Sequence, residues 1–108
     1  MECRIRDVLI ERSKCVDLSA KFSVLKSVVF MDCDLEGANF LGAKMENVLF
    51  MNCNLNNSQF SQTKLKNVSF KGSSIQGISI DKESFGGITV NTGQALYLVS
   101  VLGLKIED

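Results

Sequence analysis

Four cysteines are the residues of this chain best suited to chemistry, because a thiolate can act as a nucleophile, a redox centre or a metal ligand. They are Cys3, Cys15, Cys33 and Cys53. They lie 12, 18 and 20 residues apart and form no CxxC pair, so their spacing indicates neither a zinc site nor a redox motif. The sequence contains no histidine, the commonest general base and zinc ligand. We therefore expect buried thiols and no nucleophile activated by histidine.

Carboxylates are the second candidate for chemistry. Asp32, Asp34 and Glu36 lie close together in the sequence, and Glu46 follows ten residues later. A solvated acidic edge accounts for them without further assumptions. The chain also lacks a Walker lysine motif and a GxGxxG motif, so nucleotide binding has no support. We predict that the chain is not an enzyme and that it has no catalytic, metal-binding or cofactor-binding residue.

The size and composition of the chain fit one small folded domain. It has 108 residues and a mass of 11.9 kDa, with twelve Lys and Arg balancing twelve Asp and Glu. A hydrophobic content of 45% and a mean hydropathy of +0.14 exclude a disordered tail or a polybasic arm. The charged N-terminal stretch lacks the apolar core of a signal peptide, and no apolar stretch is long enough to span a membrane. We expect a cytoplasmic protein that does not bind membranes.

The sequence has a period of five residues, and this period must determine where the cysteines and carboxylates lie. Every fifth residue from Ile5 to Val90 is hydrophobic, eighteen positions in all, where the composition predicts about eight. Six of the seven phenylalanines fall in this register. The residue two positions earlier is mostly small or β-branched, and the residue two positions later is mostly Gly, Asn or Asp, which tolerate the backbone of a tight corner. The pattern predicts an extended chain that turns every five residues.

Stacking the sequence in steps of twenty aligns identical residues into columns. The clearest columns are Val8, Val28, Val48 and Val68; Phe30, Phe50 and Phe70; Phe40 and Phe60; and Leu35, Leu55 and Ile75. Identical residues twenty apart therefore stack into ladders, as expected if the chain returns to the same position every twenty residues. Cys33 and Cys53 share a column within disulfide range, but a reducing compartment favours free thiols.

Units such as CDLEG, ANFLG, CNLNN and SSIQG resemble the pentapeptide-repeat proteins. The resemblance implies an all-β solenoid, a right-handed quadrilateral β-helix of four to five 20-residue coils, over residues 1–90. The sequence departs from the family pattern at Cys15, at Leu18 to Ala20 and at Glu83, where we expect distorted coils.

Residues 91–108 break the period and predict a short C-terminal α-helix cap followed by a short strand. Asn91 or Thr92 is placed near the N-cap, Gln94 to Leu102 form the helix body, and Gly103 ends it. The helix is apolar on both sides, more than capping requires. The segment resembles the ending through which several pentapeptide-repeat proteins dimerise. We predict a homodimer with contacts at Leu96, Tyr97, Val101, Leu104 and Ile106.

The outward positions predict two surface features. A basic face surrounds the column of Leu25, Met45 and Leu65, interrupted by Glu46; its cations are Arg4, Arg6, Lys26, Lys44, Lys64 and Lys66. This face is either a solvated surface whose long side chains cover the strands, or a site for an anionic partner. Direct nucleic-acid binding is not expected, because the face has no interleaved aromatic residues.

The second feature is an apolar patch beside the Phe30, Phe50 and Phe70 column. Val29, Met31, Leu49 and Met51 should point outward, with Leu9 preceding the column and Leu41 adjoining across a corner. An exposed apolar surface of this kind marks an interface, either with a protein partner or with a second copy of the chain, although such stacks also stabilise extended strands by themselves.

Two functions follow from these features. The first is a non-enzymatic structural or protein-interaction module that presents flat faces to a partner. The alternative comes from the resemblance alone: some family members bind DNA gyrase or topoisomerase IV as duplex-shaped mimics and confer fluoroquinolone resistance. A net charge of zero and a basic face count against mimicry of a nucleic acid.

Overall fold

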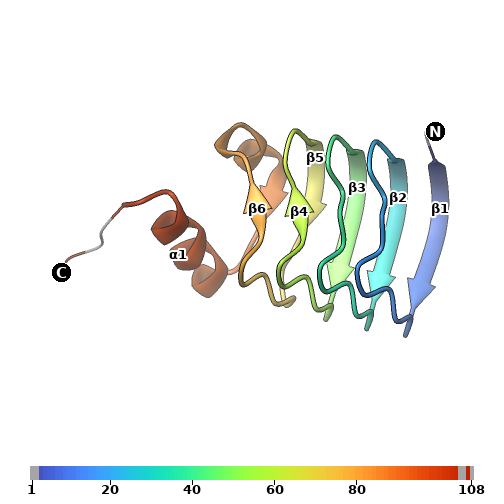
Figure 1. Cartoon of the computed structure of the whole chain (residues 1–108), viewed down its shortest axis with the longest axis horizontal. Helices are drawn as coiled ribbons and strands as arrows, with labels where there is room; N and C mark the ends of the chain where they lie inside the picture. The colour runs from blue at the N-terminus through green and yellow to red at the C-terminus, as the bar shows by residue number, and fades with distance from the viewer. Residues whose placement is uncertain (1–2, 105–106, 108) are drawn as a thin grey trace.

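A computed structural model describes residues 3–104 and 107 as a parallel β-solenoid of about four turns, with a helix across its C-terminal end (Figure 1). One five-stranded sheet has the order β1 (Arg4–Glu11), β2 (Val24–Met31), β3 (Lys44–Met51), β5 (Lys64–Ser69) and β7 (Ile88–Thr89). A two-stranded sheet pairs β4 (Gln59–Phe60) with β6 (Ser79–Ile80). The predicted fold class is confirmed.

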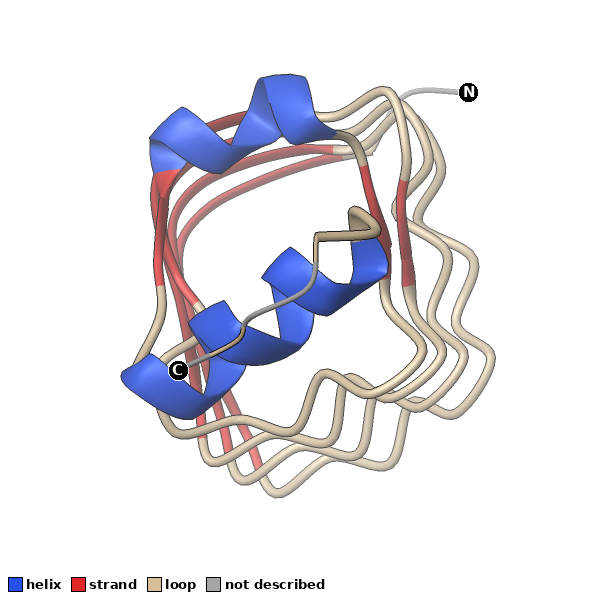
Figure 2. Ribbon diagram, turned by 90° about the vertical axis from the view of Figure 1, so that its left-hand side faces the viewer, coloured by secondary structure: helices blue, strands red, loops and turns tan. Residues whose placement is uncertain are grey.

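The coil length of twenty residues is confirmed by the strand register. Val8 pairs with Val28, Val28 with Val48, and Val48 with Val68, all in parallel. The two sides with little regular strand keep the same offset through isolated bridges, such as Lys14 with Asp34. Each coil therefore lies directly over its neighbour on all four sides, and Figure 2 shows the resulting quadrilateral outline.

The corners explain why the chain turns every five residues. Residue 7 and every fifth residue up to 77 have a positive φ, in the left-handed region. Most of these residues are Gly, Asn or Asp, as predicted, but Arg12, Phe22, Ser27 and Gln62 adopt the same conformation. Hydrogen bonds between coils hold them there; the Phe22 N–H, for example, donates to the Leu41 carbonyl at 2.8 Å. The stacking overrides the local preference of these residues.

The interior is a continuous stack of aromatic rings. Phe50 stacks on Phe30 at 5.0 Å and on Phe70 at 5.4 Å between ring centroids. Phe40 and Phe60 approach the Phe50 ring edge-on from the opposite side, at 6.1 and 5.9 Å. All of these rings are buried, so the interior holds no space for a substrate in this part of the solenoid.

Distorted coils were expected at both ends of the repeat, but only the C-terminal end departs from the regular coil. The coil around Cys15 and Leu18 to Ala20 is not distorted, since Cys15 and Ala20 donate backbone hydrogen bonds to Asp34 and Asn39. Its inward side chains are only half-buried, and they border a cavity of about 160 Å³. The departure at Glu83 does change the backbone, which forms the 3₁₀-helix η1 (Lys82–Gly87) there.

Helix α1 (Thr92–Val101) caps the solenoid through Gln94, for which the sequence predicted only a place in the helix body. Asn91 is the N-cap and forms a capping box with Gln94, at 2.9 Å for both hydrogen bonds. The buried Gln94 Nε2 also donates to the carbonyls of Phe70 and Ser73, at 2.6 and 2.7 Å. Gly103 follows the helix with φ +86°, as expected for a C-terminal stop. None of the described helices has the length and apolar character needed to cross a membrane.

Phe50 is the central ring of the stack, so we expect Phe50→Ala to destabilise the fold more than most single substitutions. The cavity and the lost ring contacts should lower the free energy of unfolding by about 3 to 5 kcal/mol. Urea denaturation of the variant beside the wild type measures this difference. A loss below about 1 kcal/mol would contradict the packing around this ring.

Gly87 and Gly86, the last two residues of η1, form a matched pair for testing how closely this helix approaches the preceding coil. A Cβ at position 87 would collide with the backbone carbonyl of Leu65, whereas a Cβ at position 86 would meet nothing within 4 Å. Gly87→Ala should therefore cost about 1 to 3 kcal/mol, because rigid backbone must move. Gly86→Ala should change the free energy of unfolding by less than about 0.5 kcal/mol. Equal thermal stability of the two variants would argue against the close approach of Gly87 to β5.

Candidate functional site

The outer surface of the five-stranded sheet carries both of the surface features suggested by the sequence. Strands β1, β2, β3 and β5 each bend at a left-handed corner, at Asp7, Ser27, Asn47 and Asn67. The sheet therefore covers two adjacent sides of the solenoid. The residues before the corner form the basic side, and those after it form the apolar side.

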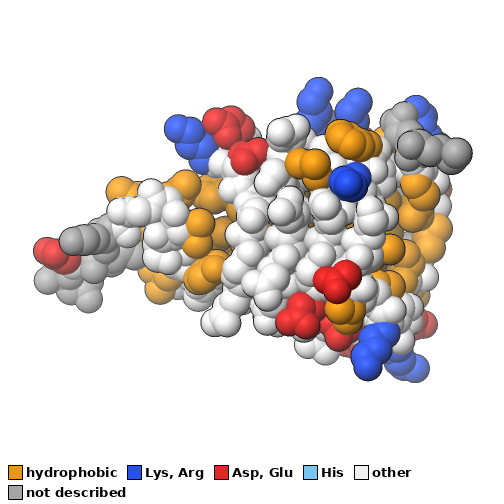
Figure 3. Space-filling view, viewed as in Figure 1, with side chains coloured by type: hydrophobic (Ala, Val, Ile, Leu, Met, Phe, Trp, Pro, Cys, Tyr) orange, Lys and Arg blue, Asp and Glu red, His pale blue; other side chains and the backbone are white. Residues whose placement is uncertain are grey.

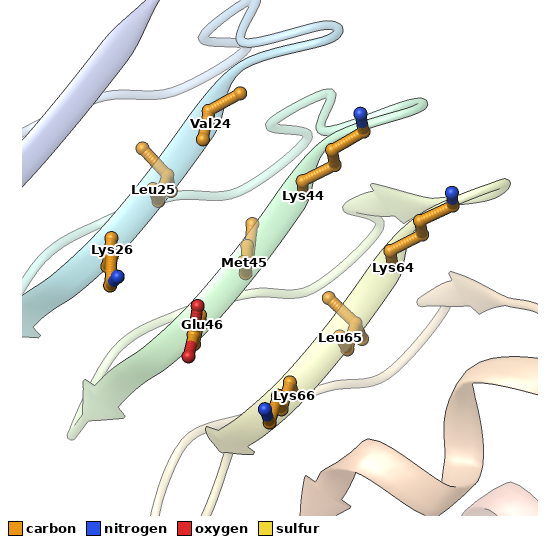
Figure 4. Close-up of a pocket in the computed structure, with 9 residues that line it drawn as sticks. All are labelled: Val24, Leu25, Lys26, Lys44, Met45, Glu46, Lys64, Leu65 and Lys66. Carbon is orange, nitrogen blue, oxygen red and sulfur yellow. The ribbon is translucent and has the colours of Figure 1, made fainter.

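The basic side is a shallow groove between two rows of side chains, which we call the basic groove. One row consists of Arg4, Val24, Lys44 and Lys64, and the other of Arg6, Lys26, Glu46 and Lys66, each in register from strand to strand. Figure 4 shows Lys44 and Lys64 on one side and Lys26, Glu46 and Lys66 on the other. The floor is strand backbone, because the side chains of Leu25 and Met45 point into the core.

Two adjoining cavities make up the groove. One, of about 310 Å³, lies over β2, β3 and β5, and the other, of about 340 Å³, lies over β1 and β2. Val24 and Lys26 line both, so the hollow runs across four strands. The sequence predicted the six cations of this face, but not that the two rows leave a hollow between them.

The lysines of the groove are not neutralised within the protein. In the described part of the chain, no side-chain ion pair or hydrogen bond is formed by Lys26, Lys44, Lys64 or Lys66. Lys44 lies directly opposite Lys64 in the parallel ladder, where like charges destabilise neighbouring strands. These four lysines therefore leave an excess of positive charge on a rigid surface, which Glu46 offsets only in part.

The apolar side carries two ladders of outward side chains, which we call the apolar patch. Leu9, Val29 and Leu49 form one ladder, and Met31 and Met51 form the other. Leu9 is 54% exposed, Leu49 40% and Met51 43%, while Val29 and Met31 are half-buried. Ser69 continues the first ladder with a polar residue. The patch is thus a contiguous apolar surface over β2 and β3 that extends onto β1 at Leu9, where Glu11 borders it beside Met31.

The expectation that Leu41 adjoins this patch is wrong. Leu41 follows Phe40, whose ring meets Phe50 edge-on from the opposite side of the core. Leu41 therefore lies on the side that carries β4 and β6. Figure 3 shows that this side is covered mainly by uncharged polar side chains, whereas hydrophobic side chains gather over the coil of β1 and on α1.

The acidic residues are part of polar ladders on the outside of the solenoid. Asn52 Nδ2 donates to Asp32 Oδ1 at 2.8 Å, and Asn54 Nδ2 donates to Asp34 Oδ1 at 3.2 Å. Among the described residues, no group of three or more His, Cys, Asp or Glu side chains is arranged to hold a metal ion. These contacts give the carboxylates a structural role between coils.

The cysteines are free thiols, and the structure gives two of them interior positions. Cys33 and Cys53 are buried, and Cys53 Sγ donates to the Phe30 carbonyl at 3.4 Å. Burial raises the pKa of the Cys53 thiol, and the pKa of Cys15 is raised by the same effect. A protonated thiol is a poor nucleophile, so the raised pKa values argue against covalent chemistry at Cys15 and Cys53.

The proposed dimer residues differ in their exposure. Leu96 and Val101 are each 51% exposed, and Leu104 is more exposed still. Tyr97 is half-buried against the last coil, and its hydroxyl accepts a hydrogen bond from the Gly77 N–H at 2.6 Å. Ile106, and with it most of the expected strand, lies outside the described residues. The exposed apolar surface of α1 is therefore formed by Leu96 and Val101.

Comparison with known proteins gives the family. The model of the pentapeptide repeat region matches residues 3–80, so the chain belongs to the pentapeptide-repeat family. Proteins of this family are structural or interaction modules and are generally non-enzymatic. A search of curated protein sequences gives no significant match.

Solved structures of the family share the fold. The pentapeptide repeat protein alr5209 of Nostoc aligns with a TM-score of 0.62 and 13% identity, over 82% of this chain and 84% of that one. HetL of Nostoc, involved in heterocyst differentiation regulation, gives 0.53 and 12%, over 70% of this chain but only 44% of HetL. A protein of the Arabidopsis thaliana thylakoid lumen gives 0.50 and 21%, over 89% of this chain and 76% of that one. At these identities the similarity concerns the fold alone.

Proposed function

We propose that this chain is a non-enzymatic interaction module and that the apolar patch is its contact with a partner protein. The observation that carries the proposal is the pair of outward apolar ladders on a side where a simple solenoid would place polar residues. Large apolar side chains that gather on one surface mark interfaces more often than scattered ones do. The flexible Met31 and Met51 suit a surface that adapts to its partner.

We also propose a homodimer formed through α1. Leu96 and Val101 expose apolar surface that the cap does not use, because Gln94 and Leu98 make the buried contacts with the solenoid. Pairing two helices about a two-fold axis would bury this surface in both copies. Such a dimer leaves the apolar patch free, since the patch lies over β1, β2 and β3.

The alternative function, binding of DNA gyrase or topoisomerase IV as a duplex mimic, has less support. A mimic of duplex DNA needs a strongly acidic surface, whereas this chain has no net charge and carries the basic groove. A supercoiling assay with purified gyrase, with and without a quinolone, separates this function from the first.

A four-fold variant tests the apolar patch. Val29→Lys, Met31→Glu, Leu49→Glu and Met51→Lys keep the net charge and place opposite charges next to each other in both ladders. We expect the variant to fold, because these side chains point outward, and to lose proteins that cross-link to the wild type. Quantitative mass spectrometry of the cross-linked proteins measures the loss.

The matched control places opposite charges next to each other on the polar side, with Gln59→Glu and Ser79→Lys, which also keep the net charge. It should retain the cross-linked proteins that the patch variant loses. If the patch variant unfolds, its side chains are interior and the assigned surface is wrong. Identical sets of cross-linked proteins from a folded patch variant and the wild type would exclude the patch as the contact.

The dimer is tested by the mass in solution. Light scattering should give about twice the 11.9 kDa of the chain, and Leu96→Asp with Val101→Asp should reduce it to a monomer because two carboxylates would be buried at the interface. Gln59→Asp with Ser61→Asp adds the same charge away from α1 and should leave the dimer intact. A monomeric wild type at tens of micromolar, or a dimer that survives the first variant, would refute this interface.

A further inference from the structure

The geometry points to a specific ligand for the basic groove: we propose that it binds an extended acidic segment of a protein. This inference rests on the proposed function only in that a partner protein supplies the segment. It uses residues different from those of the apolar patch, so either proposal can fail while the other holds.

The dimensions of the groove suit one extended chain. The rows lie on both sides of Leu25, Met45 and Leu65, near the start of β2, β3 and β5, and β1 extends them by one strand. Four strands at about 4.8 Å give a groove some 14 Å long, which an extended peptide covers with about four residues. Alternate side chains of such a peptide point to opposite rows, so acidic side chains would reach lysines on both sides.

The charge of the groove favours an anionic occupant. Six of the eight outward positions are cationic, and the Lys44 and Lys64 ammonium groups repel each other in the free protein. A carboxylate placed between them would replace this repulsion by two attractive contacts. The aliphatic stems of the lysines line the walls and would cover the apolar part of the segment.

Glu46 distinguishes a peptide from a nucleic acid. It lies in the middle of one row, between Lys26 and Lys66 in the ladder register. A phosphodiester backbone offers only acceptors and negative charge, which Glu46 would repel. A peptide carries its negative charge on side chains, which can point toward the lysines, and its backbone N–H groups can donate to the Glu46 carboxylate. In the described residues, no aromatic side chain lines the groove to stack on bases.

The position of the groove agrees with a protein ligand. The groove and the apolar patch lie on the same strands, separated by the corner residues Ser27 and Asn47. A partner that covers the patch would extend across this corner to reach the groove. The patch would supply apolar contact and the groove would orient the partner through charge, a division that is common in protein interfaces.

Fluorescence anisotropy with labelled octaglutamate tests the proposal, at near-physiological ionic strength because salt screens surface charges. We expect saturable binding by the wild type and none of octaglutamine. Lys44→Glu with Lys64→Glu should weaken binding by about tenfold or more, since two attractive contacts become repulsive. Lys14→Glu with Lys21→Glu makes the same change of charge on the other sides and should alter binding by less than about twofold.

Several results would overturn the proposal. One is the absence of octaglutamate binding by the wild type, and another is an equal loss in the two double variants, which would show attraction to net charge alone. A single-stranded oligonucleotide of eight thymidines that binds as tightly as octaglutamate would make the groove a nucleic-acid surface instead. Should the charge reversal impair folding, Lys44→Gln with Lys64→Gln removes the same contacts, and undiminished binding by that variant would likewise exclude the groove. The four-fold patch variant should bind octaglutamate like the wild type.

Discussion

The left-handed corner that recurs every five residues is the constraint on which the whole structure depends. Because a corner occurs at residue 7 and at every fifth residue up to 77, each coil takes twenty residues and lies over the next without slipping. The side chains at some corners fit this stacking as well. A Cβ on Gly37 would collide with the Asp17 side chain, and one on Gly42 with the Phe22 ring, so a large residue in one coil covers a glycine in the next. A single missing residue would move every later core residue out of its inward position.

The same register determines the surface. Residues twenty apart lie side by side, so a preference at one outward position becomes a row of similar side chains about 4.8 Å apart. Asparagines use this to hydrogen-bond along the ladder, as Asn67 does with Asn47 at 2.7 Å. Neighbouring lysines cannot hydrogen-bond to each other, because an ammonium group has no acceptor. The fold tolerates the repulsion between Lys44 and Lys64 because the aromatic core stabilises the stacked coils. A ladder of like charges therefore lowers the stability of the fold by an amount that it tolerates, and a ligand of opposite charge would relieve the repulsion.

The period in the sequence predicts the structure of the repeating coils, but it does not predict the structure at the ends of the repeat. The period of five was sufficient to predict the coil, the columns and the faces of Lys44 and Met51, because side-chain direction follows from position alone. The 3₁₀-helix at Lys82–Gly87 and the hydrogen bonds of Gln94 depend on how one particular end is closed, and no period describes them. The regular coil around Cys15 was missed for the opposite reason: poor matches to the repeat are tolerated when backbone hydrogen bonds to the next coil hold them in register. The hollow between the two rows does not follow from the period, because it depends on the length and direction of the side chains as well as on their positions.

Rigidity decides how such a surface can recognise a partner. The fifteen left-handed corners between residues 7 and 77, together with the buried core, hold the backbone beneath the outer side chains rigid. Binding therefore does not require ordering of the solenoid backbone. The cost of association then falls mainly on the partner, which must order any flexible segment that it contributes. A groove and an apolar patch on one bent sheet reduce that cost in different ways, since charge guides the encounter and apolar contact slows dissociation. A repeat whose interior is closed to ligands can therefore be selective through the order of residues in its outer columns alone.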